Sequence, residues 1–300
     1  MESLKTILYF SIFRYPLTLE EIHSYTNNAS VNETIKELET LISDDIISKI
    51  DIFYVYNKDF DSVTKRLKGN IQAQKVLSIA KKRSKYIAKF PFVMAVGVSG
   101  SLSKGYYDDK SDIDFFVITK PNKLWICRTL LMAYKKIFLL NSRKYFCINY
   151  FISTQHLEIE EKNRFTATEL KTLIPMEGKE IFSTFFANNL WVKNYFSKFE
   201  TNLNTISNTK KPFISKSIEF IFNTGLGEIT DNLFKKITIR KWKSKFNFLS
   251  NEDFNIALKS TQNISKHHPS NFQKKVILSL NSKIEEVETN FNIILSKENV

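Results

Sequence analysis

The chain is poor in cysteine and has no long apolar run. Only two cysteines, Cys127 and Cys147, occur among its 300 residues, which excludes a disulfide framework. Both lie in apolar stretches, so we expect buried thiols. No apolar run has the length needed to span a bilayer. The N-terminus, Met1–Lys5, also lacks the basic and long apolar segments of a secretory leader. These absences predict a cytoplasmic protein without a membrane span.

Acidic residues are missing from one stretch and concentrated in another. Residues 1–62 hold five basic and eleven acidic residues, whereas residues 63–90 hold nine basic residues and no acidic one. Because the whole chain has a net charge of +13, everything after residue 62 is strongly basic on balance. This asymmetry favours a polyanionic ligand, such as a nucleotide, a nucleic acid or a phosphorylated substrate. The chain is also rich in Lys, Asn and Ile, as AT-biased coding would give. Such a bias is a second explanation of the basic charge.

Polar residues gather where two apolar runs meet. The first run, Val93–Ser99, ends in Gly100 and Ser101, and the second begins with Asp112 and Asp114, one residue apart. On a strand, residues two apart point to the same face, so we expect the two carboxylates to project together. Such a pair calls for a cation, and Mg²⁺ prefers carboxylates combined with substrate phosphates. Gly100 permits close backbone approach, and a short helix opening at Ser101 would favour an anion.

This arrangement resembles the nucleotidyltransferase superfamily, which has the DNA-polymerase-β-like fold. The signature is Gly-Ser or Gly-Gly, a short gap, then Asp, an apolar residue, and Asp or Glu. The residues that match are Gly100, Ser101, Asp112 and Asp114. Ser99 departs mildly from the apolar residue usual before the glycine, and Lys104-Gly105 is similar to the Arg-Gly of many minimal members. The resemblance implies a Mg²⁺-dependent enzyme that transfers a nucleoside monophosphate from an NTP to a hydroxyl.

The family also implies a third metal-binding carboxylate on the next strand, where this sequence offers Asn149. Three interpretations remain open. Asn149 is a neutral ligand in a slower or one-metal enzyme; a glutamate such as Glu158 or Glu169 completes the site; or the protein binds a nucleotide without turning it over. The candidate catalytic residues are Asp112, Asp114 and Asn149; the metal ligands Asp112 and Asp114; the nucleotide-binding residues Gly100, Ser101 and Lys104.

Residues 1–62 predict three helices followed by a β-hairpin. The expected helices are residues 3–13, a short helix capped by Thr18 with Glu21 in a capping box, and Val31–Ser43 capped by Ser30. The expected strands are Ile46–Ile50 and Phe53–Tyr56. This order resembles the winged helix fused to some bacterial nucleotidyltransferase-like proteins.

The charges of this N-terminal unit argue against DNA binding. Its third helix carries Glu33, Glu37 and Glu39 against Lys36. Because phosphate neutralisation supplies most of the affinity for DNA, an acidic helix is badly suited to that task. We favour a role in docking or in presenting a substrate.

The fold class expected is α+β in three domains. Residues 1–62 form the winged helix, residues 63–155 a nucleotidyltransferase core with a small mixed sheet flanked by helices, and residues 156–300 a helical domain. The core elements are helix 63–90, strands Phe92–Ser99 and Asp112–Thr119, helix 123–140 and strand Tyr145–Ile152. The later helices expected are one capped by Thr166 with Glu169, and those near 178–188, 213–224, 228–247, 251–264 and 270–299. Pro175, Pro212 and residues 202–211 mark joints.

Several further residues carry weaker signals. His267-His268 has the composition of a metal pair, but adjacent loop histidines rarely share one ion. Trp125, Arg128 and Trp191 are either core residues or the lining of a base or acceptor pocket, and Asp108 and Asp109 are expected on the surface. The acceptor stays open between a small molecule, a protein side chain and an RNA 3′ end. The alternative function is a catalytically impaired nucleotide-binding or scaffold protein that docks partners through the winged helix.

Overall fold

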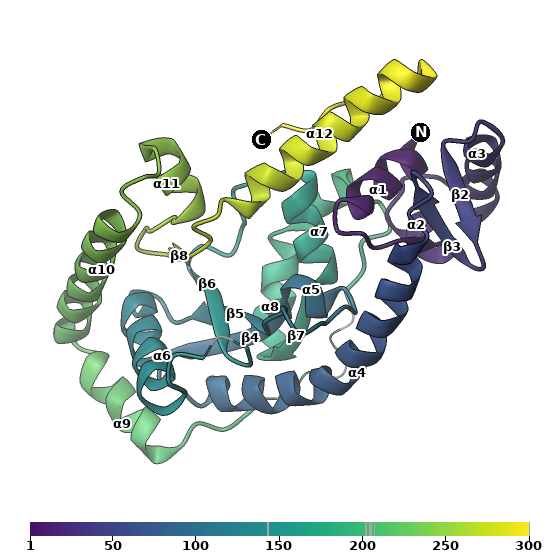
Figure 1. Ribbon diagram of the computed structural model, residues 1–300. Helices are drawn as coiled ribbons and strands as arrows, with labels where there is room; N and C mark the ends of the chain where they lie inside the picture. The colour runs from purple at the N-terminus through teal and green to yellow at the C-terminus, as the bar shows by residue number, and fades with distance from the viewer. Residues whose placement is uncertain (143, 202, 204–205, 207, 300) are drawn as a thin grey trace.

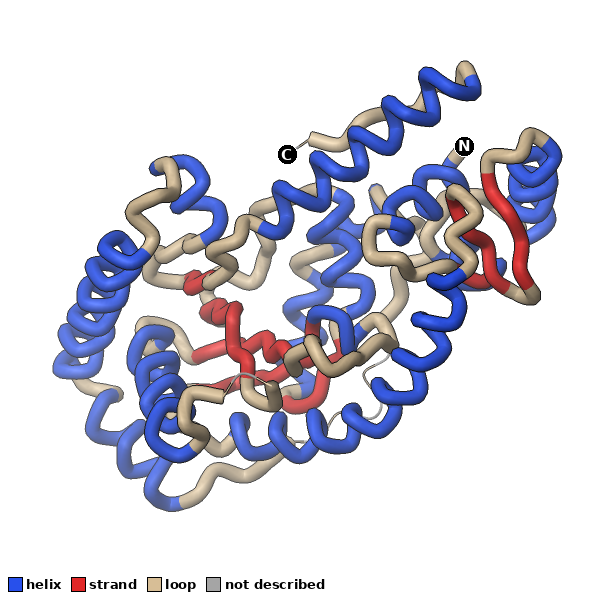
Figure 2. The backbone as a smooth tube through the Cα atoms, viewed as in Figure 1, coloured by secondary structure: helices blue, strands red, loops and turns tan. Residues whose placement is uncertain are grey.

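The computed structural model describes every residue except 143, 202, 204, 205, 207 and 300. It is an α+β structure with two separate β-sheets, which Figure 2 shows as two groups of strands, the smaller one near the N-terminus. The expected α+β class is therefore confirmed. Among the described residues, no helix combines the length and the apolarity that crossing a bilayer requires.

The N-terminal unit holds three helices and a three-stranded antiparallel sheet. Its elements are α1 (Glu2–Ser11), β1 (Leu17–Thr18), α2 (Leu19–Ser24), α3 (Val31–Ser43), β2 (Ile47–Ile50) and β3 (Phe53–Tyr56), with strand order β1-β3-β2. The caps agree with the sequence: Thr18 and Glu21 form a capping box, and the Ser30 side chain accepts from the Glu33 N–H. The short β1 was not expected. The identification of residues 1–62 as a winged helix stays a prediction.

The central sheet has five strands rather than the three expected. Its order is β7 (Ile174–Glu177), β4 (Val93–Ser99), β5 (Asp114–Thr119), β6 (Cys147–Ser153) and β8 (Ile264–Lys266). Among the strands that the structure describes, only the β5–β6 pair is parallel, so the sheet is mixed. The expectation that the chain is purely helical after residue 156 is wrong, because β7 and β8 return to form the two edges of this sheet.

Helices cover both faces of the central sheet. One face packs against α4 (Asp61–Ala88) and α6 (Leu124–Phe138), and Cys127 is buried there. The other face packs against α7 (Arg164–Thr172), α8 (Lys179–Ala187), α12 (Phe272–Phe291) and the N-terminal unit, in one continuous hydrophobic core. Figure 1 shows α4 linking the N-terminal unit to the sheet. Since residues of 1–62 share a core with the rest, the three-domain division stays a prediction.

The remaining elements are mainly helical, and several bounds differ from expectation. They are α5 (Gly100–Ser103), the 3₁₀ helix Leu190–Asn194, α9 (Phe213–Phe222), α10 (Gly225–Lys245) and α11 (Asn251–Ala257). The helix expected over 251–264 ends at Ala257 because the chain turns into β8. α7 is capped by Asn163, whose side chain accepts from the Thr166 N–H, and not by Thr166.

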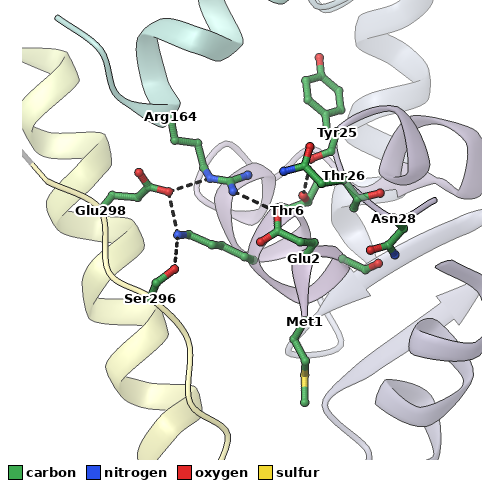
Figure 3. A network of polar contacts seen from close by, with 12 residues as sticks. Met1, Glu2, Thr6, Tyr25, Thr26, Asn28, Arg164, Ser296 and Glu298 are labelled. Carbon is green, nitrogen blue, oxygen red and sulfur yellow. Dashed lines mark hydrogen bonds and ion pairs between the residues drawn. The ribbon is translucent and has the colours of Figure 1, made fainter. Parts of the chain in front are cut away.

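The segment after α12 folds back and joins three parts of the chain. The Glu298 carboxylate accepts from Arg164 Nε of α7 at 2.9 Å and contacts Lys5 Nζ of α1 at 2.8 Å. Lys5 also donates to Ser296 Oγ at 3.1 Å (Figure 3). All three charged side chains are buried, with 5 to 7 % of each exposed. This network fixes α1 and α7 to the C-terminal segment.

Candidate functional site

The turn after β4 contains a glycine, Gly100, that lies against Asp114. Gly100 has φ +71°, and a Cβ placed on it would lie 2.5 Å from Asp114 Oδ2. A side chain is therefore excluded both by the backbone conformation and by the carboxylate beside it. The first turn of α5 follows at once, with Ser103 Oγ donating to the Gly100 carbonyl at 2.8 Å. The Gly-Ser turn and the aspartate segment, ten residues apart in sequence, thus touch.

Asp114 is the first residue of β5 and pairs with Ser99 of β4 on one side and Cys147 of β6 on the other. Burial raises the pKa of its carboxyl to about 7, and the nearby Asp112 and Glu169 carboxylates act in the same direction. Asp112 lies just before the strand rather than in it, since β5 begins two residues later than expected. Because burial and two nearby carboxylates disfavour the ionised form of the Asp114 carboxyl, a cation bound beside it would stabilise that form.

Asn149 reaches Asp114 through an irregularity in β6. Phe115 pairs with Ile148 and Phe116 with Tyr150, so Asn149 is the extra residue of a bulge. Bulges re-aim side chains, and here the Asn149 amide nitrogen lies 3.0 Å from Asp114 Oδ1. The backbone carbonyl of Asn149 accepts from the backbone N–H of His267 at 2.8 Å. The side chain that the sequence placed at the third ligand position is therefore in direct contact with Asp114.

The two glutamates considered as replacements lie in different places. Glu169 of α7 lines the same cavity as Asp114, and its carboxylate is 2.7 Å from Lys104 Nζ. Lys104 also donates to the Gly100 carbonyl at 3.1 Å. Glu158 pairs with Lys162 at 2.6 Å, is half exposed, and does not line the cavity. Glu169 is thus the glutamate near the site, but it is paired with a cation.

No third acidic ligand completes a metal cluster in the described part of the chain. No group of three or more His, Cys, Asp or Glu side chains there is arranged to hold a metal ion. Carboxylate oxygens still suit a hard cation, and Asp114 Oδ2 adjoins Gly100 in a carboxyl whose ionised form burial disfavours. The chemistry of Asp112 and Asp114 therefore fits a divalent cation.

The site opens into a cavity of about 500 Å³, within the range of small-molecule sites. Its walls come from regions that the sequence did not connect: Phe10, Phe13 and Tyr15 of the N-terminal unit; Phe165, Thr166 and Glu169 of α7; and Lys266, His268, Phe272 and Gln273 near the C-terminus. Sequence analysis missed most of these, because no local pattern marks residues that meet only in the tertiary fold.

The N-terminal unit also holds the turn that carries the motif. Tyr15 Oη donates to the Lys104 carbonyl at 2.9 Å, and Asn70 of α4 donates to Tyr15 Oη at 3.2 Å. Asn70 further donates to the Gly105 carbonyl. The backbone just after the Gly-Ser turn is therefore fixed by a residue of the N-terminal unit and by α4.

The weaker candidates lie outside the site, with one exception. The His267 ring packs at a tilt against Trp242, with ring centroids 4.9 Å apart, whereas His268 lines the cavity, so the two do not form a metal pair. The Arg128 guanidinium lies 4.7 Å from the Trp242 ring and 5.8 Å from that of Trp125, an arrangement of the core. The Trp191 ring packs on Tyr195 at 6.0 Å, away from the cavity lining. Asp108 is bonded within its own loop, to Ser111 and Tyr106.

Comparison with known families agrees with the motif. Residues 74–164 match the model of the nucleotidyltransferase domain. This span contains the Gly-Ser turn, the aspartate pair and Asn149. No curated protein and no solved structure matches the chain. The match supports membership of residues 74–164 in the superfamily and nucleotidyl transfer in general.

Proposed function

We propose that this protein transfers a nucleoside monophosphate from an NTP to the hydroxyl of an acceptor, with Mg²⁺ held by Asp112 and Asp114. The contact of Gly100 with Asp114, inside a matched nucleotidyltransferase domain, is the observation that carries the proposal. A metal ion held by carboxylates could act on a phosphate only if the turn that binds the phosphate adjoins those carboxylates. The low cysteine content supports a cytoplasmic location.

Each residue of the site has a part in the reaction. The backbone of Gly100 and Ser101 would bind the β- and γ-phosphates. Mg²⁺, when bound, would neutralise charge on the phosphates and make the acceptor hydroxyl more acidic. The hydroxyl oxygen bonds to the α-phosphorus as the bond from that phosphorus to the bridging oxygen breaks. Pyrophosphate leaves, and the hydroxyl proton passes to solvent. Lys104 neutralises Glu169 and holds the Gly100 carbonyl.

Asp114→Ala tests this function directly. Pyrophosphate release from ATP, CTP, GTP and UTP would be measured with Mg²⁺ and a cell extract as the source of acceptor, and we expect the variant to lose it. Asp109→Asn, in the loop between the Gly-Ser turn and the aspartates, is exposed; it is the matched control and should keep wild-type release. Circular dichroism verifies the fold of each variant. Wild-type release by Asp114→Ala contradicts the proposal.

A second function is favoured by one contact. Asn149 directs its amide nitrogen to Asp114, so it satisfies the carboxylate as a hydrogen-bond donor and brings no negative charge of its own. In this alternative the protein binds a nucleotide as a scaffold and turns none over. Calorimetry with each NTP, with and without Mg²⁺, separates the two: metal-dependent binding without any pyrophosphate release favours the alternative.

A further inference from the structure

A row of three side chains crosses the floor of the cavity, away from the aspartates. Phe116 of β5 pairs with Tyr150 of β6, and Tyr150 pairs with Lys266 of β8. All three line the cavity, and the Phe116 and Tyr150 rings stack at 5.3 Å. Asp114 lies two residues before Phe116 and thus on the same face. Strand spacing puts the Lys266 backbone about 12 Å from that of Asp114.

The Lys266 end of the cavity carries a positive charge that the Glu161 carboxylate attracts but does not pair with. Its ammonium donates to Gln273 Oε1 at 3.1 Å and forms no ion pair with a carboxylate of the described residues. Glu161, which also lines the cavity, is paired with Lys259 at 3.1 Å. Burial, together with the positive charge of Lys266, lowers the pKa of His268 to about 4, so this imidazole is neutral at pH 7.

The end of the cavity at the aspartates is acidic, opposite in sign to the Lys266 end. The charged side chains that act on Asp114 there are Asp112, Glu169 and Lys104, and the last two are paired with each other, so that end attracts the metal and the triphosphate bound to it. A half-buried ammonium without a counter-ion is costly, and burial lowers the pKa of Lys266. An anion from the ligand removes that cost. The triphosphate belongs at the aspartates, so this second anion comes from the acceptor.

Aromatic rings also line the cavity. Besides Phe116 and Tyr150, the Phe272 ring packs 6.0 Å from Phe165 and 6.2 Å from Phe13. These three residues come from α12, α7 and the N-terminal unit, and all line the cavity. A flat apolar body bound among them would be contacted by rings from separate parts of the chain.

We propose that Lys266 binds an anionic group of the acceptor, which is a small molecule with a hydroxyl, a flat apolar body and a carboxylate or phosphate. This inference rests on the proposed function for the role of the hydroxyl, but the binding of the anion does not depend on catalysis. It gives the N-terminal unit a role in presenting the substrate, because Phe13 forms part of the wall around the apolar body.

Calorimetry with defined probes tests the anion site. The carboxylate probe is 3-(4-hydroxyphenyl)propionate and its neutral counterpart is the methyl ester; the phosphate probe is phenyl phosphate and its counterpart is phenol. Because a charged hydrogen bond contributes about 1.5–3 kcal/mol, we expect an acid to bind at least about tenfold more tightly than its counterpart. The pair of probes with the larger ratio of affinities shows whether the anionic group of the acceptor is a carboxylate or a phosphate.

Variants assign the effect to Lys266. Lys266→Met should abolish the preference for the acid, Lys266→Arg should retain it, and the exposed Lys275→Met of α12 is the matched control that leaves it unchanged. The proposal is overturned if neither acid binds wild type better than its counterpart, including the case of no binding at all, or if Lys266→Met keeps the preference. Asp114→Ala, which tests catalysis, should keep the preference, so failure of the proposed function is distinguished from failure of the anion site.

Discussion

The Asn149 amide nitrogen lies 3.0 Å from Asp114 Oδ1, across the only parallel strand pair of the central sheet as described. The contact exists because β6 bulges at Asn149 and turns this side chain toward the neighbouring strand. A hydrogen-bond donor here stabilises the Asp114 carboxylate without a metal. A carboxylate here would instead repel it and require a cation. The chemistry of this one side chain therefore decides how strongly the site depends on metal.

Asn149→Asp should make folding depend on Mg²⁺. Without metal we expect a loss of about 1–3 kcal/mol, because a hydrogen bond is replaced by a repulsion between carboxylates. With Mg²⁺ the variant should recover more stability than wild type gains. Thermal unfolding over a Mg²⁺ titration measures both quantities. Asn149→Ala, which loses the hydrogen bond but adds no charge, is the control and should show no such recovery. Equal responses of Asn149→Asp and wild type to Mg²⁺ would contradict the interpretation.

Gly100→Ala should destabilise the protein by more than about 2 kcal/mol, because a left-handed backbone and a close contact are both imposed on the new methyl group. The added Cβ would meet Asp114 Oδ2 at 2.5 Å. Urea unfolding measures the loss. Gly225→Ala at the start of α10 is the matched control, since a Cβ there meets nothing within 4 Å. That control should be neutral or slightly stabilising, and a loss equal to that of Gly100→Ala would show that the contact is not the cause.

Local patterns in the sequence were sufficient for the motif and for the caps of the early helices. The Gly-Ser turn, the aspartates and the run of β4 are short-range features, and so is the capping box of Thr18 and Glu21. Each depends on residues within a few positions of one another. The position of Asp112 outside β5 shows the usual limit of such reasoning, which is the exact end of an element.

The two edge strands could not be predicted in the same way. β7 reads Ile-Pro-Met-Glu, and Pro175 was interpreted as a joint; it is tolerated in β7 because this strand lies at the edge of the sheet. β8 has only three residues, too few to show an alternation. Both strands are stabilised by pairing with distant partners. Lys266 of β8 reaches the cavity for that reason, and no local signal marks it.

Tyr15→Phe should weaken the contact between the N-terminal unit and the backbone that follows the Gly-Ser turn. The change removes the donor to the Lys104 carbonyl and the acceptor for Asn70, with an expected cost of about 1–2 kcal/mol. Because the affected backbone follows Gly100 and Ser101, the KM for the NTP should rise several-fold while the aspartates stay intact. Steady-state kinetics measures the KM, with the exposed Tyr145→Phe as the control. An unchanged KM together with an unchanged stability would show that this contact does not support the turn.

Glu298→Gln should destabilise the protein in a pH-dependent manner. Burial alone would raise the pKa of Glu298, but Lys5 and Arg164 outweigh it and lower the pKa below its ordinary value of 4.5. A carboxyl with a lowered folded-state pKa stabilises the fold fully above its unfolded-state pKa. This contribution is lost as the pH falls through the folded-state value. At pH 7 we expect a loss of about 3 kcal/mol, since Gln leaves two buried cations without their partner.

Urea unfolding of wild type and Glu298→Gln at several pH values measures this dependence. The difference in the free energy of unfolding should stay constant from pH 7 to pH 6 and shrink once the pH falls below about 4.5. Glu285→Gln is the control, because Glu285 pairs with Lys297 at 2.7 Å on the surface and should cost less than about 1 kcal/mol. Since Arg164 begins α7, whose Glu169 pairs with Lys104 beside Gly100, Glu298→Gln should also weaken NTP binding. A difference that is independent of pH would mean that the Glu298 carboxylate is not the group that fixes α1 and α7 to the C-terminal segment.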